Sequence, residues 1–217
     1  MNAWDERAEA YRTSVTHATG EDLDAVVELC NPHQGVKVLD VATGGGHVAR
    51  RLREHGAQVV TADASPGMQP DVVTRAEHLP FADGSFDVVV TRIAPHHFEN
   101  VGAAVGEMAR VSNRVVVIED MLYRSEEEQE AEKLRDPTHV RSLSAEEWRA
   151  LLVDAGLEVE QELYFSKVHD FYDWLARVGC EGEAAKRVRE LLAQYTSEDG
   201  RSWSNDYIVV KARKSQK

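Results

Sequence analysis

Three consecutive glycines, Gly44 to Gly46, follow a short apolar segment and precede a segment with a helical pattern, in the stretch VLDVATGGGHVARRL (residues 38–52). Glycine adopts left-handed backbone conformations at little cost and lets the main chain approach a ligand that any Cβ would push away. Gly44, Gly46 and Ala49 also match the spacing of the dinucleotide fingerprint, and Asp63 lies near the place expected for an acid that binds a ribose. The pattern predicts an adenosine ligand. It leaves open a nicotinamide cofactor, another adenosine cofactor, or a tight turn without a ligand.

Histidine side chains at two places could take part in proton transfer. His96 and His97 directly follow an apolar segment, and an imidazole is suited to deprotonate a phenol or an acidic carbon near neutral pH. His139 lies in RDPTHVR (residues 135–141), where Pro137 interrupts an acidic helical segment. The alternative for each is structural: His97 packed for support, and His139 exposed among surface charges. We predict His96, His97 and His139 as catalytic candidates.

Strands and helices alternate along most of the chain. Seven short segments rich in Val and Ile are predicted as strands, at residues 36–42, 58–64, 70–76, 86–93, 113–120, 157–165 and 205–212. The first five lack strict alternation of apolar and polar residues, which is typical of strands buried on both faces. Helical patterns lie at residues 22–29, 48–54, 101–111, 144–155 and 183–194. The alternation predicts an α/β fold with a mostly parallel, doubly wound sheet.

Two segments fall outside this alternation, at residues 121–143 and 166–201. They follow strands at the edge of the sheet where ligand crevices form in open α/β folds. Together with residues 1–20 they are predicted to form a helical cap over the site. The acidic part of the first segment, residues 125–133, is interpreted as the solvated face of a helix.

Composition excludes several classes of protein. A chain of 217 residues with 42% hydrophobic content predicts a single domain, residues 1–217. The 38 acidic and 25 basic residues give a net charge of -13, which would repel nucleic acid. No apolar run approaches the roughly 20 residues of a spanning helix, and the N-terminus is too charged for a signal peptide. We therefore predict a cytoplasmic protein without membrane insertion. Cys30 and Cys180 stand alone, so no metal site is expected.

Further motifs decide between the possible cofactors. The chain resembles the class I S-adenosylmethionine-dependent methyltransferases, in the small-molecule group similar to the ubiquinone and menaquinone biosynthesis methyltransferases. The matching segments are VLDVATGGGHVA, VVTADASPGM, AEHLPFADGSFDVVVTR, APHHF, ERAEAYR and LRDPTHVRSLSAEEWRALLVDAGL. They cover nearly the whole chain. AEHLPFADGSFDVVV is the most specific of them, and a nicotinamide dehydrogenase has no reason to carry it.

The resemblance implies a Rossmann-like sheet of seven strands in the order 3-2-1-4-5-7-6, with the last strand antiparallel, and S-adenosyl-L-methionine as cofactor. Asp63 would accept hydrogen bonds from both ribose hydroxyls, a strong charge-assisted pair. Asp40 would order the glycine loop. The remaining cofactor-binding residues implied by the resemblance are Tyr11, Thr43, Gly44, Gly46, Ser65, Met68, Ala76, Glu77 and Arg92.

These residues are assigned to different parts of the cofactor. The glycine loop would surround the methionine part, and Tyr11 would close over the same end, with His17 as a possible neighbour. Ser65 and Met68 match positions beside the adenine, where a thioether packs well on a ring face. The backbone around Ala76 would pair with the adenine edge.

The sequence departs from the family pattern at two positions beside the adenine. Arg75 stands where the family often has an acid that accepts from the adenine amino group, so Glu77 or a backbone carbonyl would have to accept instead. Only Gln69 and Pro70 separate Met68 from the next strand, where the family usually has a helix. Of the expected properties, the affinity for the cofactor is the one that these two departures affect most.

The expected function is methyl transfer to a small, partly apolar organic molecule, on an oxygen, carbon or nitrogen atom, by a possible homodimer. A catalytically inactive methyltransferase-like binding protein is the alternative. An NAD(P)-dependent oxidoreductase is a remote one.

Overall fold

The computed structural model describes residues 3–14 and 18–215, and seven of its strands form one sheet in the order β3-β2-β1-β4-β5-β7-β6. The strands are β1 Lys37–Val41, β2 Gln58–Asp63, β3 Val72–Val73, β4 Phe86–Arg92, β5 Ser112–Met121, β6 Leu157–Asp170 and β7 Ser202–Lys214. Neighbouring strands from β3 to β5 are parallel, and β7 is antiparallel to both β5 and β6. The predicted strand order and the antiparallel last strand are confirmed.

The helices follow the predicted alternation. They are α1 Ala3–Thr13, α3 Glu21–Cys30, α4 His47–Glu54, α5 Val101–Val111, α6 Glu126–Arg135, α7 Ala145–Asp154, α8 Phe171–Ala176 and α9 Gly182–Leu191, with short 3-10 turns η1 Pro66–Met68, η2 Pro95–His97 and η3 Ala193–Tyr195. The start of α7 is a capping box, in which the Ser144 hydroxyl accepts from the Glu147 amide and the Glu147 carboxylate accepts from the Ser144 amide. Each of these helices is too short to cross a bilayer.

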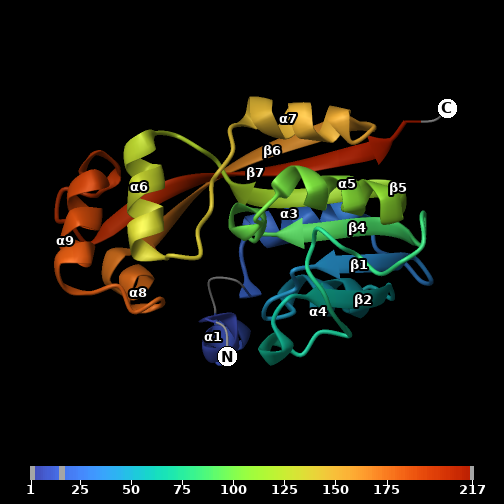
Figure 1. Ribbon diagram of the computed structural model, residues 1–217, viewed down its shortest axis with the longest axis horizontal. Coiled ribbons are helices and arrows are strands. Elements are labelled where there is room, and N and C mark those ends of the chain that lie inside the picture. The colour runs from blue at the N-terminus through green and yellow to red at the C-terminus, as the bar shows by residue number, and fades with distance from the viewer. Residues whose placement is uncertain (1–2, 15–17, 216–217) are drawn as a thin grey trace.

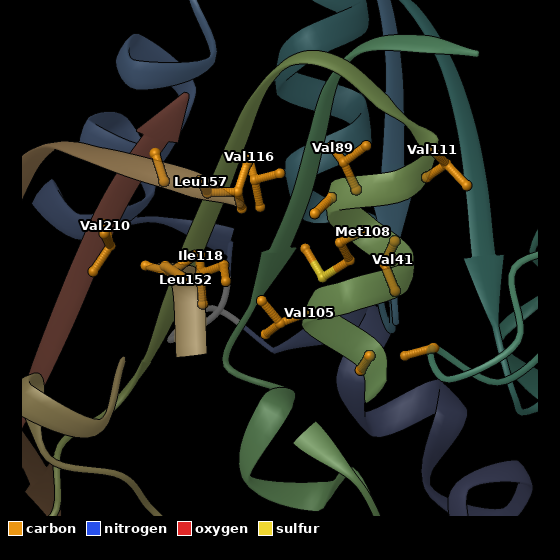
Figure 2. Packing of buried hydrophobic residues seen from close by; sticks show 14 of the residues in the cluster. Val41, Val89, Val105, Met108, Val111, Val116, Ile118, Leu152, Leu157 and Val210 are labelled. Carbon is orange, nitrogen blue, oxygen red and sulfur yellow. The ribbon is translucent and has the colours of Figure 1, made fainter. Parts of the chain in front are cut away.

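The sheet is buried on both faces, as the unbroken apolar segments predict. Val89, Val116 and Ile118 point to one face and pack with Val105 and Met108 of α5 (Figure 2). Their neighbours in sequence point to the other face, where α3 and α4 cover them. Successive side chains of a strand point to opposite faces of the sheet. Because helices cover both faces here, the central residues of a strand between them are apolar on both faces.

The third predicted strand is much shorter than expected. Only Val72 and Val73 pair with β2, whereas residues 70–76 were predicted. The Asp71 carboxylate accepts from the amide and the hydroxyl of Thr61, both at 2.8 Å, and so fixes the start of the strand. At its end the Thr74 amide bonds to the Asp63 carbonyl and the chain turns toward the cleft described below.

The last two strands are longer than predicted. β6 continues to Asp170 and β7 begins at Ser202, so the cap segment predicted at residues 166–201 starts with five residues of strand. Figure 1 shows these extensions reaching α6, α8 and α9, which gather at the end of the sheet toward which β1 and β4 point.

The cap helices have a hydrophobic core of their own. Its buried members come from α6, α8, α9, β7 and the residues that follow α8 and α9, and are Ala131, Phe171, Trp174, Leu175, Cys180, Val188, Leu191, Leu192 and Trp203. The interpretation of residues 125–133 as a solvated face is wrong in part, since Glu128 and Glu132 are buried. Glu128 accepts two hydrogen bonds from Arg124, and Glu132 pairs with Arg135 at 3.3 Å, so these acids face the protein.

Candidate active site

A cleft of about 430 Å³ lies at the carboxyl ends of the parallel strands. Its walls come from the loops after β1, β2, β3 and β4, from α1, and from the segment between α6 and α7. Open α/β sheets bind ligands at this edge because the loops that diverge there leave a crevice. Among the predicted site residues, the cleft brings together Tyr11, Asp40, Thr43, Gly44, Asp63, Met68, Ala76, Glu77, Arg92 and His97.

The glycine loop leaves open space at two of its three glycines. Gly44 and Gly46 have left-handed backbones, with φ of +52° and +72°. A Cβ added at Gly46 would meet no atom within 4 Å, and one at Gly44 would meet only a carbonyl oxygen at 4.0 Å. The Thr43 hydroxyl donates to the buried Asp40 carboxylate at 2.6 Å, which fixes the loop, and burial raises the pKa of Asp40 to about 6.

The middle glycine makes room for the protein itself. A Cβ at Gly45 would lie 2.6 Å from the carbonyl oxygen of Tyr11 and 2.8 Å from Nε2 of His47. His47 donates from Nε2 to the same carbonyl at 2.9 Å. Helix α1 therefore docks on the glycine loop, a contact between distant segments that the spacing of the glycines did not reveal.

Asp63 lies at the end of β2 and points both carboxylate oxygens toward backbone amides. The Gly44 amide donates to Oδ2 and the Ser65 amide to Oδ1, each at 2.9 Å. Burial raises the pKa of Asp63. Asp63 also lines the cleft, and since a carboxylate has about four lone-pair sites, these two bonds leave it capacity to accept from a hydroxyl there.

The side predicted for the adenine is formed only partly as expected. Met68 and Ala76 line the cleft, but Ser65 does not. The Ser65 hydroxyl donates instead to Asp5 of α1 at 2.6 Å, and Asp5 also accepts from the Gly67 amide. Helix α1 thus packs over η1, next to the place where the expected helix is missing.

Arg75 and Glu77 are paired at the rim of this part of the cleft. Arg75 lies 3.4 Å from the Glu77 carboxylate and 3.0 Å from that of Glu99. The other Glu77 oxygen accepts from the Asn100 amide at 3.2 Å. Arg75 is thereby held by two acids, and both Arg75 and Glu77 line the cleft.

Arg92 reaches the cleft from the end of β4, but its guanidinium is engaged in a buried charge network. It donates to Glu119 at 2.6 Å and to Asp22, and Lys167 pairs with the same two acids. Two cations and two carboxylates compensate one another here. This arrangement indicates that Arg92 supports the β4 end of the cleft.

The three predicted histidines lie together after β4. The ring centroids are 4.0 Å apart for His96 and His97, 5.3 Å for His96 and His139, and 6.3 Å for His97 and His139. The segment that carries His139 is tied to η2, because the amides of Val140 and Arg141 both donate to the His96 carbonyl. The break at Pro137 thus precedes a segment that turns inward.

His97 is the one of these three that lines the cleft. Its Nδ1 lies 3.0 Å from the Thr138 carbonyl oxygen, which can only accept, so Nδ1 carries the proton and Nε2 has a free lone pair. Burial, and then the neighbouring His96, lower the pKa of His97 well below 6.5. Trp4 of α1 packs against this ring at 4.6 Å in an edge-to-face contact.

His96 and His139 are buried behind His97. Nδ1 of His96 lies 2.5 Å from the Asp120 carboxylate; burial opposes the charged ring, but Asp120 outweighs it and the pKa of His96 is raised. Nε2 of His139 pairs with the Gln129 side-chain oxygen at 2.9 Å, and burial followed by His96 lowers the pKa of His139 to about 3. Neither ring lines the cleft; His139 supports the histidine cluster, and His96 borders a smaller cavity behind His97.

Several residues around the cleft were not predicted from the sequence. Trp4 lies on α1 beside Tyr11, with ring centroids 5.9 Å apart, and the pair of aromatic residues near the N-terminus was a usable signal. Ile93 directly follows β4 with φ of +51°, a rare conformation for a β-branched residue, and such strain concentrates at functional sites. The residues around Ile93 in the sequence do not indicate this backbone conformation. His17, the possible neighbour of Tyr11, lies outside the described residues.

Comparisons with known proteins agree with the geometry. A model of the methyltransferase domain family matches residues 9–162. The uncharacterized methyltransferase YcgJ of Bacillus subtilis (strain 168) is 30% identical over 205 residues, covering 83% of this chain and 80% of the relative. A demethylmenaquinone methyltransferase of Beutenbergia cavernae is 36% identical over 108 residues, 44% of this chain and 45% of the relative.

A solved structure extends the similarity to the fold. The crystal structure of YcgJ matches with a TM-score of 0.81 at 25% identity, covering 90% of this chain and 98% of that one. The predicted family is therefore confirmed by sequence and by fold. The chain belongs to the methyltransferase domain family and is a class I S-adenosylmethionine-dependent methyltransferase.

Proposed function

We propose that the cleft binds S-adenosylmethionine and that the enzyme transfers its methyl group to a small organic acceptor. The observation that carries this proposal is the meeting of three features in one cleft: the glycine loop at Gly44, the Asp63 carboxylate, and the free Nε2 of His97. A volume of about 430 Å³ lies within the usual range for small-molecule sites.

The residues fit the parts of this cofactor. Asp63 would accept from the ribose hydroxyls, and the loop with Thr43 and Gly44 would surround the methionine part. Met68 and Ala76 would lie against the adenine, with the Glu77 carboxylate or a nearby carbonyl accepting from its amino group. When bound, the cofactor supplies an electrophilic methyl group on a positively charged sulfur.

The protein's own contribution is alignment, exclusion of water and, for some acceptors, proton removal. Methyl transfer is an in-line displacement, so the acceptor atom has to be held behind the methyl group. Trp4 and Tyr11 cover the cleft from α1 and limit the access of water. His97 is neutral at pH 7, and its Nε2 would take the proton of an acceptor that must be deprotonated.

A thermal melt tests the cofactor. S-adenosylhomocysteine should raise the melting temperature and NADH should not, since a ligand at 100 times its dissociation constant stabilises a protein by about 2.7 kcal/mol. A response to NADH alone, or equal responses to both, would refute the proposal. A response to S-adenosylhomocysteine without conversion of any acceptor would favour the inactive alternative. The homodimer and the cytoplasmic location stay predictions.

A further inference from the structure

A second, smaller cavity of about 50 Å³ adjoins the cleft. Tyr11, Ile93 and His97 line both, so the two spaces share a wall. The far side of the small cavity is formed by the cap and by the extended ends of the last two strands. Its volume suits one compact chemical group of a few atoms rather than a whole cofactor. We call it the inner cavity.

The inner cavity contains an arginine, Arg177, that has no side-chain hydrogen bond or ion pair among the described residues. Arg177 follows α8, is partly buried, and its guanidinium forms no hydrogen bond or ion pair with any residue of 3–14 and 18–215 whose side chain is described. Arg135, which also lines the cavity, differs in this respect. It donates to the Trp174 carbonyl at 3.2 Å, pairs with Glu132 at 3.3 Å, and stacks over the Trp174 ring at 4.0 Å.

The other charged groups of the inner cavity are already compensated. Lys167 pairs with Asp22 and Glu119 in the network described above. The acid of the cavity wall, Asp136, accepts from Arg7 at 2.9 Å and from the amide and hydroxyl of Thr138. Among the described residues no acid is therefore paired with Arg177, and a partly buried guanidinium gains free energy when an anion meets it.

We infer that the inner cavity binds an oxyanion, a carboxylate or a phosphate, on the methyl acceptor, with Arg177 as its charged partner. The planar fork of a guanidinium matches the paired oxygens of either group. The Tyr207 hydroxyl, which accepts from Asn205 at 3.2 Å, lies in the same wall and can donate a hydrogen bond to the anion. The proposed function then gains a substrate class: an anionic acceptor whose reacting atom lies near the wall shared by Tyr11 and His97.

This inference rests on the proposed function, and its test separates the two. Protein saturated with S-adenosylhomocysteine is titrated calorimetrically with benzoate, with phenyl phosphate and with benzamide, the uncharged counterpart of benzoate. Benzoate or phenyl phosphate should bind and benzamide should not, and the stronger of the two anions identifies the oxyanion. Arg177→Gln should weaken the binding of that anion roughly ten- to hundredfold. Arg177→Lys, which keeps the charge but loses the fork, should fall between the two.

Arg201→Gln is the matched control. It removes an arginine from the same cap, but this side chain is 86% exposed and its nearest acid is 4.0 Å away. Its anion affinity should equal that of the original protein. Equal binding of benzoate and benzamide, no binding of either anion, or an anion affinity that Arg177→Gln leaves unchanged would overturn the inference while the proposed function stands. Failure of S-adenosylhomocysteine to bind would instead refute the proposed function.

Discussion

Replacement of Asp63 by asparagine tests the cofactor site most directly. The carboxylate already accepts from the Gly44 and Ser65 amides, and the two ribose hydroxyls are proposed to use its remaining lone pairs. Asparagine has one carbonyl oxygen and no charge, so at least one charge-assisted bond to the ribose is lost. Such a bond contributes about 1.5–3 kcal/mol, which corresponds to a roughly 10- to 150-fold weaker affinity for S-adenosylhomocysteine.

The same substitution also has a structural effect that must be separated from binding. The asparagine NH2 group faces one of the two backbone amides, and loss of that hydrogen bond should lower the free energy of unfolding by about 1–3 kcal/mol. Asp71→Asn is the matched control, because Asp71 accepts from the amide and hydroxyl of Thr61 but does not line the cleft. It should lower the melting temperature and leave the affinity for S-adenosylhomocysteine unchanged.

The pH dependence of binding gives a second readout. Burial raises the pKa of Asp63 in the free protein, and the ribose hydroxyls donate to the ionised form. Affinity for S-adenosylhomocysteine should therefore fall as the pH is lowered through the raised pKa, and it should lose this dependence in Asp63→Asn. Calorimetric titration measures both. A folded Asp63→Asn protein with the original affinity would show that Asp63 only orders the loop and that the ribose is bound elsewhere.

Three further predictions concern the histidines and the glycine loop. Once an acceptor is known, His97→Gln should lower turnover roughly 100- to 10,000-fold with little change in cofactor affinity. The rate of the original enzyme should decline only below pH 6.5, because the pKa of His97 is lowered. Unchanged turnover in His97→Gln would mean that catalysis depends on alignment alone. Asp120→Asn removes the carboxylate that raises the pKa of His96, so the pKa of His96 should fall and that of His97 should rise in an NMR titration; an unmoved pKa of His97 would contradict the coupling. Gly45→Ala should displace α1 and lower both the melting temperature and the cofactor affinity. The control is Gly106→Ala, whose added Cβ meets nothing within 4 Å and which should stabilise the protein by about 0.5–1 kcal/mol. Equal effects of the two substitutions would refute the role of Gly45 in the docking of α1.

Patterns within a short stretch of sequence predicted the elements well. The capping box at Ser144 and the unbroken apolar strands follow local rules, and the structure contains both. The strand order came from the resemblance to the methyltransferases and was confirmed. The lengths of the last two strands were underestimated, because their extensions carry polar residues that pair beyond the main sheet.

Contacts between distant segments were beyond local patterns. Ser65 bonds to a residue 60 positions earlier, and His47 to one 36 positions earlier, so neither contact leaves a periodic signal. The clustering of His96, His97 and His139 was only partly foreseeable. The sequence placed two of them after a strand and the third after a helix break, but which ring meets the cleft depends on the packing of α6 and the segment after it.

The separate core of the cap bears on how such an enzyme could change its substrate. The residues that hold α6, α8 and α9 together are distinct from those that hold the sheet, and Arg177 and Trp174 belong to this part of the chain. The loops proposed for the cofactor depend on the sheet and on α1. Substitutions in α8 and the loop after it can therefore change which acceptor is bound while cofactor binding is kept. This division favours gradual divergence among relatives. It also makes residues 171–180 a rational target for libraries selected for new acceptors.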